Sequence, residues 1–154
     1  HIDVDYEFPF PTKRKLKYTV DSLLEDKVSD EYFITETCLN NIETYLEDFK
    51  LNSRYSESHA LLANEIRKSR CNFRCDGISP CMTAKMGTGG NNIPVLVKEK
   101  RKLTERECLR IMGYPDSYKI KENYHQSYKQ IGNSVVVPIV RDISKQLVKI
   151  VKEN

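Results

Sequence analysis

The sequence of 154 residues is long enough for one ordinary domain with a modest core and too short for two large ones. Hydrophobic residues make up 39% of it and charged residues 31%, and no apolar run approaches the roughly 18 to 20 residues that a membrane span requires, so we expect a soluble protein without a membrane partner. Five cysteines at irregular spacings favour reduced thiols in the cytoplasm over a disulfide framework. The first residue is His1 rather than Met, and we expect the sequence to belong to something longer.

The first predicted elements are a connector and a helix. Residues 6–18, YEFPFPTKRKLKY, combine prolines with a basic run and predict an extended connector. From Thr35 the apolar residues recur at three- and four-residue spacing, which predicts an amphipathic helix with Thr35 or Thr37 as its N-cap. The core candidates on that helix are Cys38, Leu39, Ile42, Tyr45, Leu46 and Phe49.

The middle of the chain carries the positive charge. Glycines and turn-forming residues interrupt every period in residues 64–92, so we expect loops there, followed by a short β-rich run from Ile93 to Lys98. Nine Lys or Arg and three acidic residues lie between Asn64 and Lys102, a net charge of +6, whereas the remaining residues carry −3. A basic segment between mildly acidic ends indicates a polyanion such as DNA as the partner, and a solvated charged face is the alternative.

A short helix with clear boundaries follows in RKLTERECLRIMGYPDSY. Thr104 and Glu107 form a capping box, and Gly113 with Pro115 ends the helix. A helix of little more than two turns depends on packing, so its apolar residues should be buried. Those residues are Leu103, Cys108, Ile111 and Met112.

The last predicted helix begins after a Gly-Asn-Ser turn, with Asn133 or Ser134 as its cap and Pro138 in or near its first turn. Its apolar residues form one stripe: Val136, Ile139, Val140, Ile143, Leu147, Ile150 and Val151. Short strands, short helices and a loop-rich middle together predict an α+β fold.

The cysteines and histidines predict no metal site. Cys71, Cys75 and Cys81 are spaced C-x3-C-x5-C, without the fourth ligand that structural zinc requires. A zinc-dependent interaction module is the alternative, and elemental analysis would detect it. His59 and His125 stand alone on polar stretches, and we expect both to be solvated.

Three stretches resemble, in order, the closing portion of the bacterial cytosine-5 DNA methyltransferases. SPCMTAKMGTGGNNIPVLV is similar to the end of the target-recognition region, and RKLTERECLRIMGYPDSYKI and YKQIGNSVVVPIV are similar to the ninth and tenth conserved blocks. YEFPFP resembles the connector after the eighth block, and residues 17–78 match only loosely, as a variable recognition region does. The resemblance implies that residues 1–16 are a connector from the catalytic domain, 17–123 the target-recognition domain, and 124–154 the tenth block and a helix returning to the α/β catalytic domain.

The resemblance also implies S-adenosylmethionine as the cofactor of the complete enzyme. The family's Phe-x-Gly-x-Gly loop, Pro-Cys-Gln nucleophile, Glu-Asn-Val acid and Gln-x-Arg-x-Arg block are absent from this sequence. Pro80-Cys81-Met82 and Glu122-Asn123-Tyr124 imitate two of them, but in the wrong order, and Cys81-Met82 replaces the Thr-Leu usual in the recognition segment. We therefore expect no catalytic residue in this chain, and no activity without the missing N-terminal catalytic domain or subunit.

The predicted site residues fall into three groups. Free backbone and positive charge suit double-stranded DNA, and the candidates are Arg67, Arg70, Arg74, Lys85, Gly87, Thr88, Gly89 and Gly90, with a flexible hairpin tip as the alternative for the glycines. Arg106 and Arg110, four residues apart, are expected to organise the recognition loops by pairing with carboxylates or backbone carbonyls. By resemblance, Gly132, Asn133 and Ser134 lie against the cofactor pocket, where a helix N-terminus would suit the cofactor carboxylate, and a simple N-cap is the alternative.

The leading hypothesis is the DNA-recognition portion of a bacterial, cytoplasmic DNA (cytosine-5-)-methyltransferase of the restriction-modification type. With the catalytic domain absent, we expect the last helix to pair with a separate N-terminal subunit, to self-associate, or to fold onto its own small domain. The alternative is a free-standing, sequence-specific DNA-binding or regulatory module without catalysis.

Overall fold

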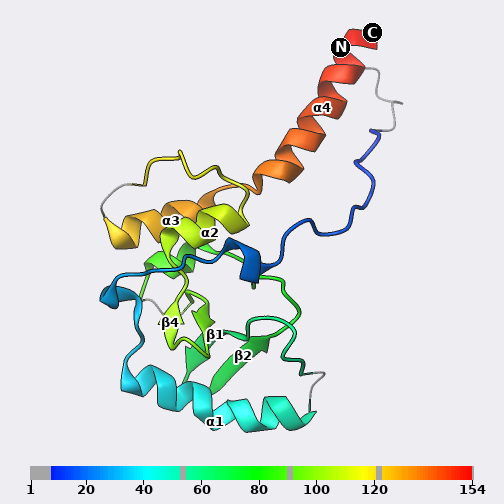
Figure 1. Ribbon diagram of the computed structural model, residues 1–154. Helices are drawn as coiled ribbons and strands as arrows, with labels where there is room; N and C mark the ends of the chain where they lie inside the picture. The colour runs from blue at the N-terminus through cyan, green and yellow to red at the C-terminus, as the bar shows by residue number, and fades with distance from the viewer. Residues whose placement is uncertain (1–7, 53–54, 90–91, 121–122, 154) are drawn as a thin grey trace.

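The computed structural model describes residues 8–52, 55–89, 92–120 and 123–153, and Figure 1 shows their arrangement. The described part of the chain contains both helices and a small antiparallel sheet, which confirms the predicted α+β class. In chain order the elements are η1 (Val20–Leu23), η2 (Asp30–Tyr32), α1 (Glu36–Asn52), β1 (Leu62–Arg67), β2 (Arg70–Arg74), η3 (Ala84–Gly87), β3 (Val95–Leu96), β4 (Arg101–Lys102), α2 (Glu105–Ile111), α3 (Tyr124–Asn133) and α4 (Val137–Glu153), where η marks a 3₁₀ helix. None of the described helices is both long and apolar enough to cross a membrane.

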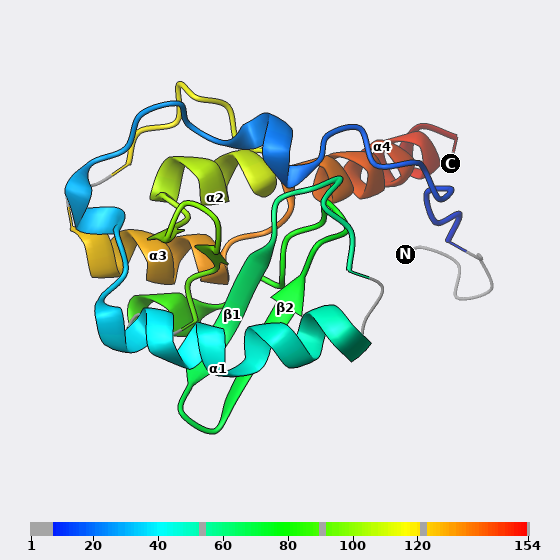
Figure 2. The ribbon, with the colours of Figure 1, turned by 60° about the horizontal axis from the view of Figure 1, so that its bottom comes forward.

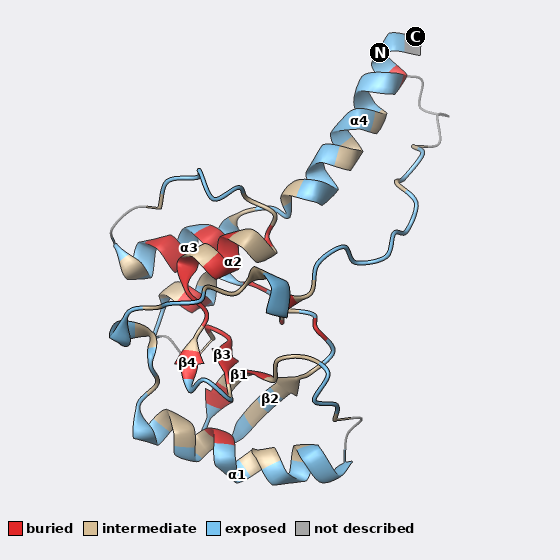
Figure 3. Ribbon diagram, in the orientation of Figure 1, coloured by how far each residue is buried: buried red, intermediate tan, exposed pale blue. Residues whose placement is uncertain are grey.

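The sheet lies between two helical layers. Its strand order is β2-β1-β3-β4, every neighbouring pair is antiparallel, and β2 forms one edge. Helix α1 covers one face, and α2, α3 and η3 lie on the other side (Figures 1 and 2). Successive side chains of each strand point to opposite faces of the sheet, and so toward one or the other helical layer. Ala63 and Val95 pack with Ile42 of α1, whereas Leu62 and Leu96 join the larger core on the side of α2 and α3, and Figure 3 shows this buried centre.

Helix α1 begins where the sequence predicted. The Thr35 hydroxyl oxygen accepts a hydrogen bond from the Cys38 backbone N–H at 3.3 Å. Ile42 is fully buried. The other members of the predicted stripe are half-buried: Cys38, Leu39, Tyr45, Leu46 and Phe49. The 3.6-residue period therefore identified the inner face of this helix correctly.

The loop-rich region predicted for residues 64–92 begins with regular structure that was not predicted there. A β-hairpin, β1 and β2, runs through it with a turn at Lys68 and Ser69. The pairing register shifts between Asn64 and Arg67, where Glu65 adopts a positive φ of 52°. This bulge breaks the alternation by which a strand is recognised in a sequence. The predicted β-rich run is confirmed, and β3 lies within it.

Helix α2 has the predicted boundaries. The Thr104 hydroxyl oxygen accepts a bond from the Glu107 N–H at 3.1 Å, and the Glu107 carboxylate accepts one from the Thr104 N–H at 2.8 Å, so the capping box is confirmed. Gly113, with a φ of 84°, follows the last turn. The predicted residues Leu103, Cys108 and Met112 are buried and Ile111 is half-buried. Leu109, which the sequence analysis did not include, is buried too.

The predicted cap of the last helix is wrong. Asn133 is the final residue of α3, and Ser134 is its C-cap, with a hydroxyl that donates to the Ile131 carbonyl at 2.7 Å. Helix α4 begins only at Val137. The sequence analysis missed α3 because its buried face is short: Tyr128 and Ile131 stand among polar residues.

Helix α4 projects from the rest of the molecule, with the N-terminal segment beside it (Figure 1). Residues 8–18 form no helix or strand, as expected of an extended connector. Arg14 forms an ion pair with Asp142, and Phe10 and Ile139 help to line a cavity of about 300 Å³ between the two segments. The apolar side chains exposed on and just before α4 are Val135, Val136, Ile139, Val140, Leu147, Val148 and Val151.

Candidate nucleic-acid interface

Edge strand β2 carries a row of polar side chains on the face that α1 does not cover. Because side chains alternate along a strand, Arg70, Asn72 and Arg74 share one face, and Cys71 and Phe73 share the other. Cys71 and Phe73 pack with the core beneath α1, so the three polar residues face away from that helix. The Cα atoms of successive members of this set are about 7 Å apart along the strand. We call Arg70, Asn72 and Arg74 the β2 row.

The turn of the hairpin adds exposed charge. Arg67 and Lys68 are exposed, and Arg67 forms no ion pair with any residue in the described ranges. The Tyr45 hydroxyl of α1 donates to the Lys68 carbonyl at 2.8 Å and so ties the turn to the helix. Arg70 lies 2.9 Å from the carboxylate of Glu65 in the bulge. The hairpin therefore holds a basic tip in a fixed position, and Figure 2 shows this tip protruding beyond α1.

A rigid turn follows the β2 row. Arg74 Nε donates to Asp76 Oδ1 at 2.9 Å, and Arg74 Nη2 donates to Asp76 Oδ2 at 2.8 Å. These bonds lower the pKa of the Asp76 carboxyl to about 2. Asp76 Oδ1 also accepts the Ile78 N–H at 3.2 Å. Gly77 between them has a φ of 73°, and its carbonyl accepts the Val20 N–H at 2.9 Å, which anchors the turn to η1.

The glycine-rich segment is only partly open. Lys85 of η3 is exposed and makes no ion pair within the part of the chain that the structure describes, and Thr88 is exposed as well. Gly87 does not have the free approach that was predicted, because a Cβ there would lie 2.4 Å from the His125 carbonyl oxygen of α3. Gly89, with a φ of 76°, has nothing within 4 Å of a Cβ position and is open. Gly90 lies outside the described residues.

The three predicted cofactor residues lie at the C-terminal end of α3, so the helix N-terminus argued from the sequence is wrong. A Cβ on Gly132 would lie 2.1 Å from the backbone carbon of Thr83, so this glycine lets α3 pack against the chain entering η3. The Ser134 hydroxyl is occupied by the Ile131 carbonyl. The Asn133 side chain is exposed. Their role toward a cofactor stays a prediction.

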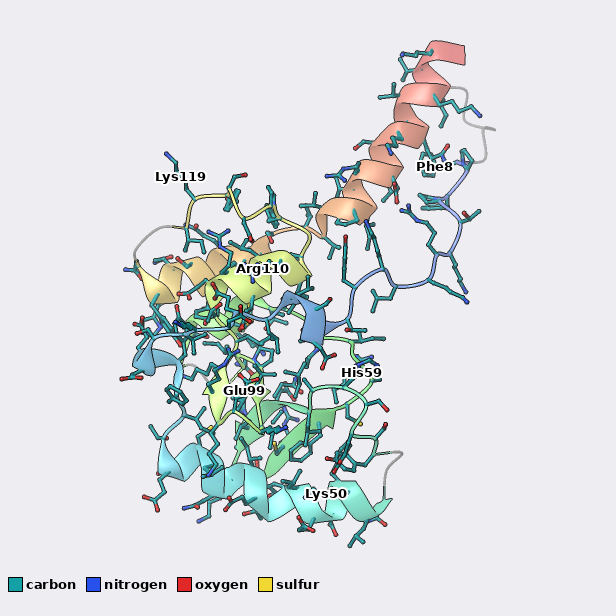
Figure 4. All side chains as sticks on the ribbon, viewed as in Figure 1. Phe8, Lys50, His59, Glu99, Arg110 and Lys119 are labelled. Carbon is teal, nitrogen blue, oxygen red and sulfur yellow. The ribbon has the colours of Figure 1, made fainter. Side chains whose placement is uncertain are left out.

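The two arginines of α2 bind a carboxylate and backbone carbonyls. Arg110, labelled in Figure 4, donates Nε and Nη2 to Asp116 at 2.8 and 2.9 Å, and Nη1 to the Leu23 carbonyl at 3.2 Å. Arg106 Nη2 donates to the Tyr118 carbonyl at 2.9 Å. These contacts fasten η1 and the turn after α2. An effect on the recognition loops stays a prediction.

A buried ion pair beneath α2 was missed by the sequence analysis, which counted Arg101 with the free positive charge. Arg101 is 3% exposed, and its Nη1 and Nη2 donate to the fully buried carboxylate of Glu107, both at 2.9 Å. That carboxylate also accepts the N–H groups of Thr104 and Glu25 at 2.8 and 2.9 Å. Burial opposes the charge of Arg101, but the bonds to Glu107 and to Glu99 raise its pKa nevertheless. The capping-box glutamate was the only sequence signal for this centre.

Two of the five cysteines, Cys38 and Cys71, pack against the same core cluster beneath α1. Within the described residues, no group of three or more His, Cys, Asp or Glu side chains is arranged to hold a metal ion. Burial raises the pKa of the Cys71 thiol to about 12, whereas Cys81 is exposed. His59 is not simply solvated, because its Nδ1 lies 3.0 Å from the Asp21 carboxylate. The absence of a metal site stays a prediction for the chain as a whole.

Comparison with known proteins supplies the family. Residues 3–149 match the family described as C-5 cytosine-specific DNA methylase. Type II methyltransferase M.Bsp6I of Bacillus sp. (strain RFL6) is 35% identical over 148 residues, which are 92% of this chain and 44% of that protein. Type II methyltransferase M1.ScrFI of Lactococcus lactis subsp. cremoris is 25% identical over 152 residues, 97% of this chain and 36% of the relative.

A shorter stretch of 44 residues, 29% of this chain and 14% of the relative, is 57% identical to Type II methyltransferase M.HhaI of Haemophilus parahaemolyticus. The chain spans less than half the length of these three relatives. The family match nevertheless covers most of the sequence. The chain therefore belongs to the C-5 cytosine-specific DNA methylase family.

Proposed function

We propose that this chain is the DNA-recognition portion of a DNA (cytosine-5-)-methyltransferase of a restriction-modification system, with double-stranded DNA as its substrate. In this proposal residues 17–123 recognise the DNA. The reactive groups and most of the S-adenosylmethionine pocket belong to a catalytic part, from which residues 1–16 lead and to which residues 124–154 return.

The observation that carries the proposal is the uncovered apolar face of α4 beside the connector. Ile139 is 57% exposed, Leu147 47% and Val151 71%, and Phe10 of the connector is 77% exposed. Contiguous apolar surface of this kind is rare on a stable monomer and marks an interaction site. Because the connector and α4 leave the small domain side by side (Figure 1), one partner body can cover both. A catalytic part docked there would supply the missing cover.

The chemistry of the reaction supports a separate catalytic part. Methylation at ring carbon 5 needs a thiolate that adds to the cytosine and an acid that protonates ring nitrogen 3. The sequence contains neither the nucleophile motif nor the acid motif of the family. Cys108 is fully buried, and burial raises its pKa well above the usual value, so it is no substitute nucleophile.

The role of this chain would be to grip and select DNA. Arg67 at the hairpin tip and Lys85 in η3 are exposed cations without an ion-pair partner among the described residues, so they are suited to phosphate contacts. The β2 row presents guanidinium and amide groups, which suit hydrogen bonds to base edges. Phosphate contacts of this kind make the affinity fall steeply with salt. Each phosphate neutralised changes the slope of log K against log salt concentration by about −0.9.

The turn at the end of α3 fits the cofactor only in part. The Cα of Gly132 is closed in by Thr83, and the Ser134 hydroxyl is engaged within its own helix. Only Asn133 offers an exposed polar side chain. We therefore propose that this turn contributes at most the Asn133 amide to the S-adenosylmethionine pocket, and that the catalytic part binds the rest of the cofactor.

A chimeric enzyme tests the proposal. The segment of the Bacillus relative that aligns with this chain would be replaced by this chain, and labelled methyl transfer to duplex DNA would be measured for the chimera and for the chain alone. We expect transfer by the chimera, and DNA binding without transfer by the chain. Transfer by the chain alone would contradict the proposal. An inactive chimera beside a chain that binds DNA would favour the free-standing DNA-binding module instead.

The docking face has its own test. Sedimentation of the chain at several concentrations should show association through α4, or a 1:1 complex once a catalytic part is added. Ile139→Glu and Leu147→Glu should abolish either, whereas Lys145→Glu, at an exposed position of the same helix, serves as the matched charge control. A strictly monomeric chain whose α4 is detached, and which binds no catalytic part, would rule the docking proposal out.

A further inference from the structure

Two hydrogen bonds join Arg74 to Asp76, and this geometry distinguishes Arg74 from the other charged residues of the interface. Arg74 contributes Nε and Nη2 to two separate carboxylate oxygens, at 2.9 and 2.8 Å, so the plane of the guanidinium is fixed. The Arg74 side chain is nevertheless 41% exposed and that of Asp76 51%. An ion pair this exposed adds little to stability, because water screens it and both side chains lose freedom. Its geometry therefore calls for another explanation.

The carboxylate that holds Arg74 is itself held. Asp76 Oδ1 accepts the Ile78 N–H at 3.2 Å, which closes a small turn around Gly77. A Cβ on Gly77 would lie 3.0 Å from the Thr19 side chain and 3.2 Å from the His59 ring, so the turn is packed against its neighbours. The turn therefore presents Asp76 to Arg74 as a fixed acceptor rather than as a mobile surface carboxylate.

The donors that remain on Arg74 point to a ligand with two acceptors. A guanidinium has five N–H groups, and the side-on pairing through Nε and Nη2 uses two of them. The end of the fork, with both hydrogens of Nη1 and the second hydrogen of Nη2, donates to no residue in the described ranges. Two parallel donors at that spacing match the O6 and N7 acceptors that guanine presents in the major groove. No other base pair offers two adjacent acceptors on one base there.

The other cations of the interface are less suited to this task. Arg70 is 54% exposed and forms an ion pair with the Glu65 carboxylate, but the described residues do not give it the two parallel hydrogen bonds that fix the plane of Arg74. Arg67 has no ion-pair partner among the described residues, and Lys85 carries a rotating ammonium group rather than a planar fork. A preorganised fork loses less side-chain entropy when it binds, and so it discriminates better between bases.

We propose that Arg74, oriented by Asp76, reads a guanine in the major groove and thereby fixes one base of the recognised DNA sequence. The inference rests on the proposed DNA-recognition function and deepens it. Arg74 is the specificity-determining residue, and Asp76 is a positioning residue that acts through it. Arg67 at the hairpin tip and Lys85 in η3, which have no ion-pair partner among the described residues, supply affinity that does not depend on sequence.

Selection of bound duplexes from a randomised DNA library tests the inference with the whole chain. The wild-type chain should enrich sites with a guanine at one position. Arg74→Lys, which keeps the charge but loses the fork, should lower the preference for that guanine roughly 5- to 100-fold and leave the other positions unchanged. Asp76→Asn keeps the turn acceptor and should weaken the same preference in part. Arg141→Lys, at an exposed position of α4 outside the candidate interface, is the matched control, and its preference at that position should equal that of the wild type.

A second measurement changes the DNA as well as the protein. Replacement of the selected guanine by 7-deazaguanine removes the N7 acceptor, so it should weaken binding by the wild-type chain and have no further effect on Arg74→Lys. Unchanged selection of the guanine by Arg74→Lys, or equal sensitivity of both proteins to 7-deazaguanine, would overturn the inference while the DNA-recognition function stands. Failure of the wild-type chain to enrich any sequence would overturn both.

Discussion

Replacing Arg101 by Met removes the partner of a buried carboxylate. Arg101 is 3% exposed and Glu107 is fully buried, and two bonds of 2.9 Å join them. Breaking such a pair leaves an uncompensated charge and costs about 3–5 kcal/mol. Methionine fills most of the volume of the arginine stem, and the backbone N–H groups of Thr104 and Glu25 still bind the carboxylate. We therefore expect the free energy of unfolding to fall by an amount near the lower end of this range, about 3 kcal/mol.

For a domain of this size the loss lowers the melting temperature by roughly 6–12 °C. Urea unfolding, followed by far-ultraviolet circular dichroism, measures the loss in the free energy of unfolding. Circular dichroism is used because the chain has no Trp to report by fluorescence. Arg70→Met is the control: its partner Glu65 is partly exposed and Arg70 is 54% exposed, so the change should cost less than about 1 kcal/mol. An Arg101→Met protein as stable as Arg70→Met would refute the reasoning.

Three further predictions follow from local geometry. Gly132→Ala places a Cβ 2.1 Å from backbone and should cost about 2–3 kcal/mol in urea unfolding, whereas Gly89→Ala meets only the strain of its positive φ and should cost about 1 kcal/mol. Iodoacetamide should alkylate exposed Cys81 well before Cys71, whose pKa burial raises to about 12, and peptide mass spectrometry would show any reversal. Carboxyl NMR should find the pKa of Asp76 near 2 instead of the ordinary 3.8. Because that pKa is lowered on folding, its contribution to stability is complete above about pH 4 and is lost as the pH falls toward 2, and a measured value near 3.8 would contradict the observed pairing.

Local signals in the sequence predicted local structure well. The capping box of Thr104 and Glu107 lies within one helical turn, so its residues alone determine the start of α2. The helical period from Cys38 to Phe49 likewise depends only on which face of α1 meets the sheet. In both places the side chains that make the structure are neighbours along the chain.

The sequence predictions were wrong where residues far apart in the chain determine the local structure. The hairpin was missed because the bulge at Glu65 breaks its alternation, and only the pairing with β2 reveals it. Arg101 looked like free charge until the fold placed Glu107 against it. Gly87 and Gly132 were interpreted as ligand-binding glycines, yet each is needed where α3 crosses η3 or the chain before it. Charge and composition cannot distinguish a glycine that leaves room for a ligand from one that allows a helix to pack closely against another segment.

One filter assay tests the central claim most directly. The purified chain would be incubated with duplex DNA and S-adenosylmethionine labelled in its methyl group, and both the DNA retained by the protein and the label in that DNA would be measured in the same sample. We expect the DNA to be retained at low salt, to be released as the salt concentration rises, and to carry no label. Label incorporated into the DNA by the chain alone, or no retention of DNA at low salt, would contradict this expectation.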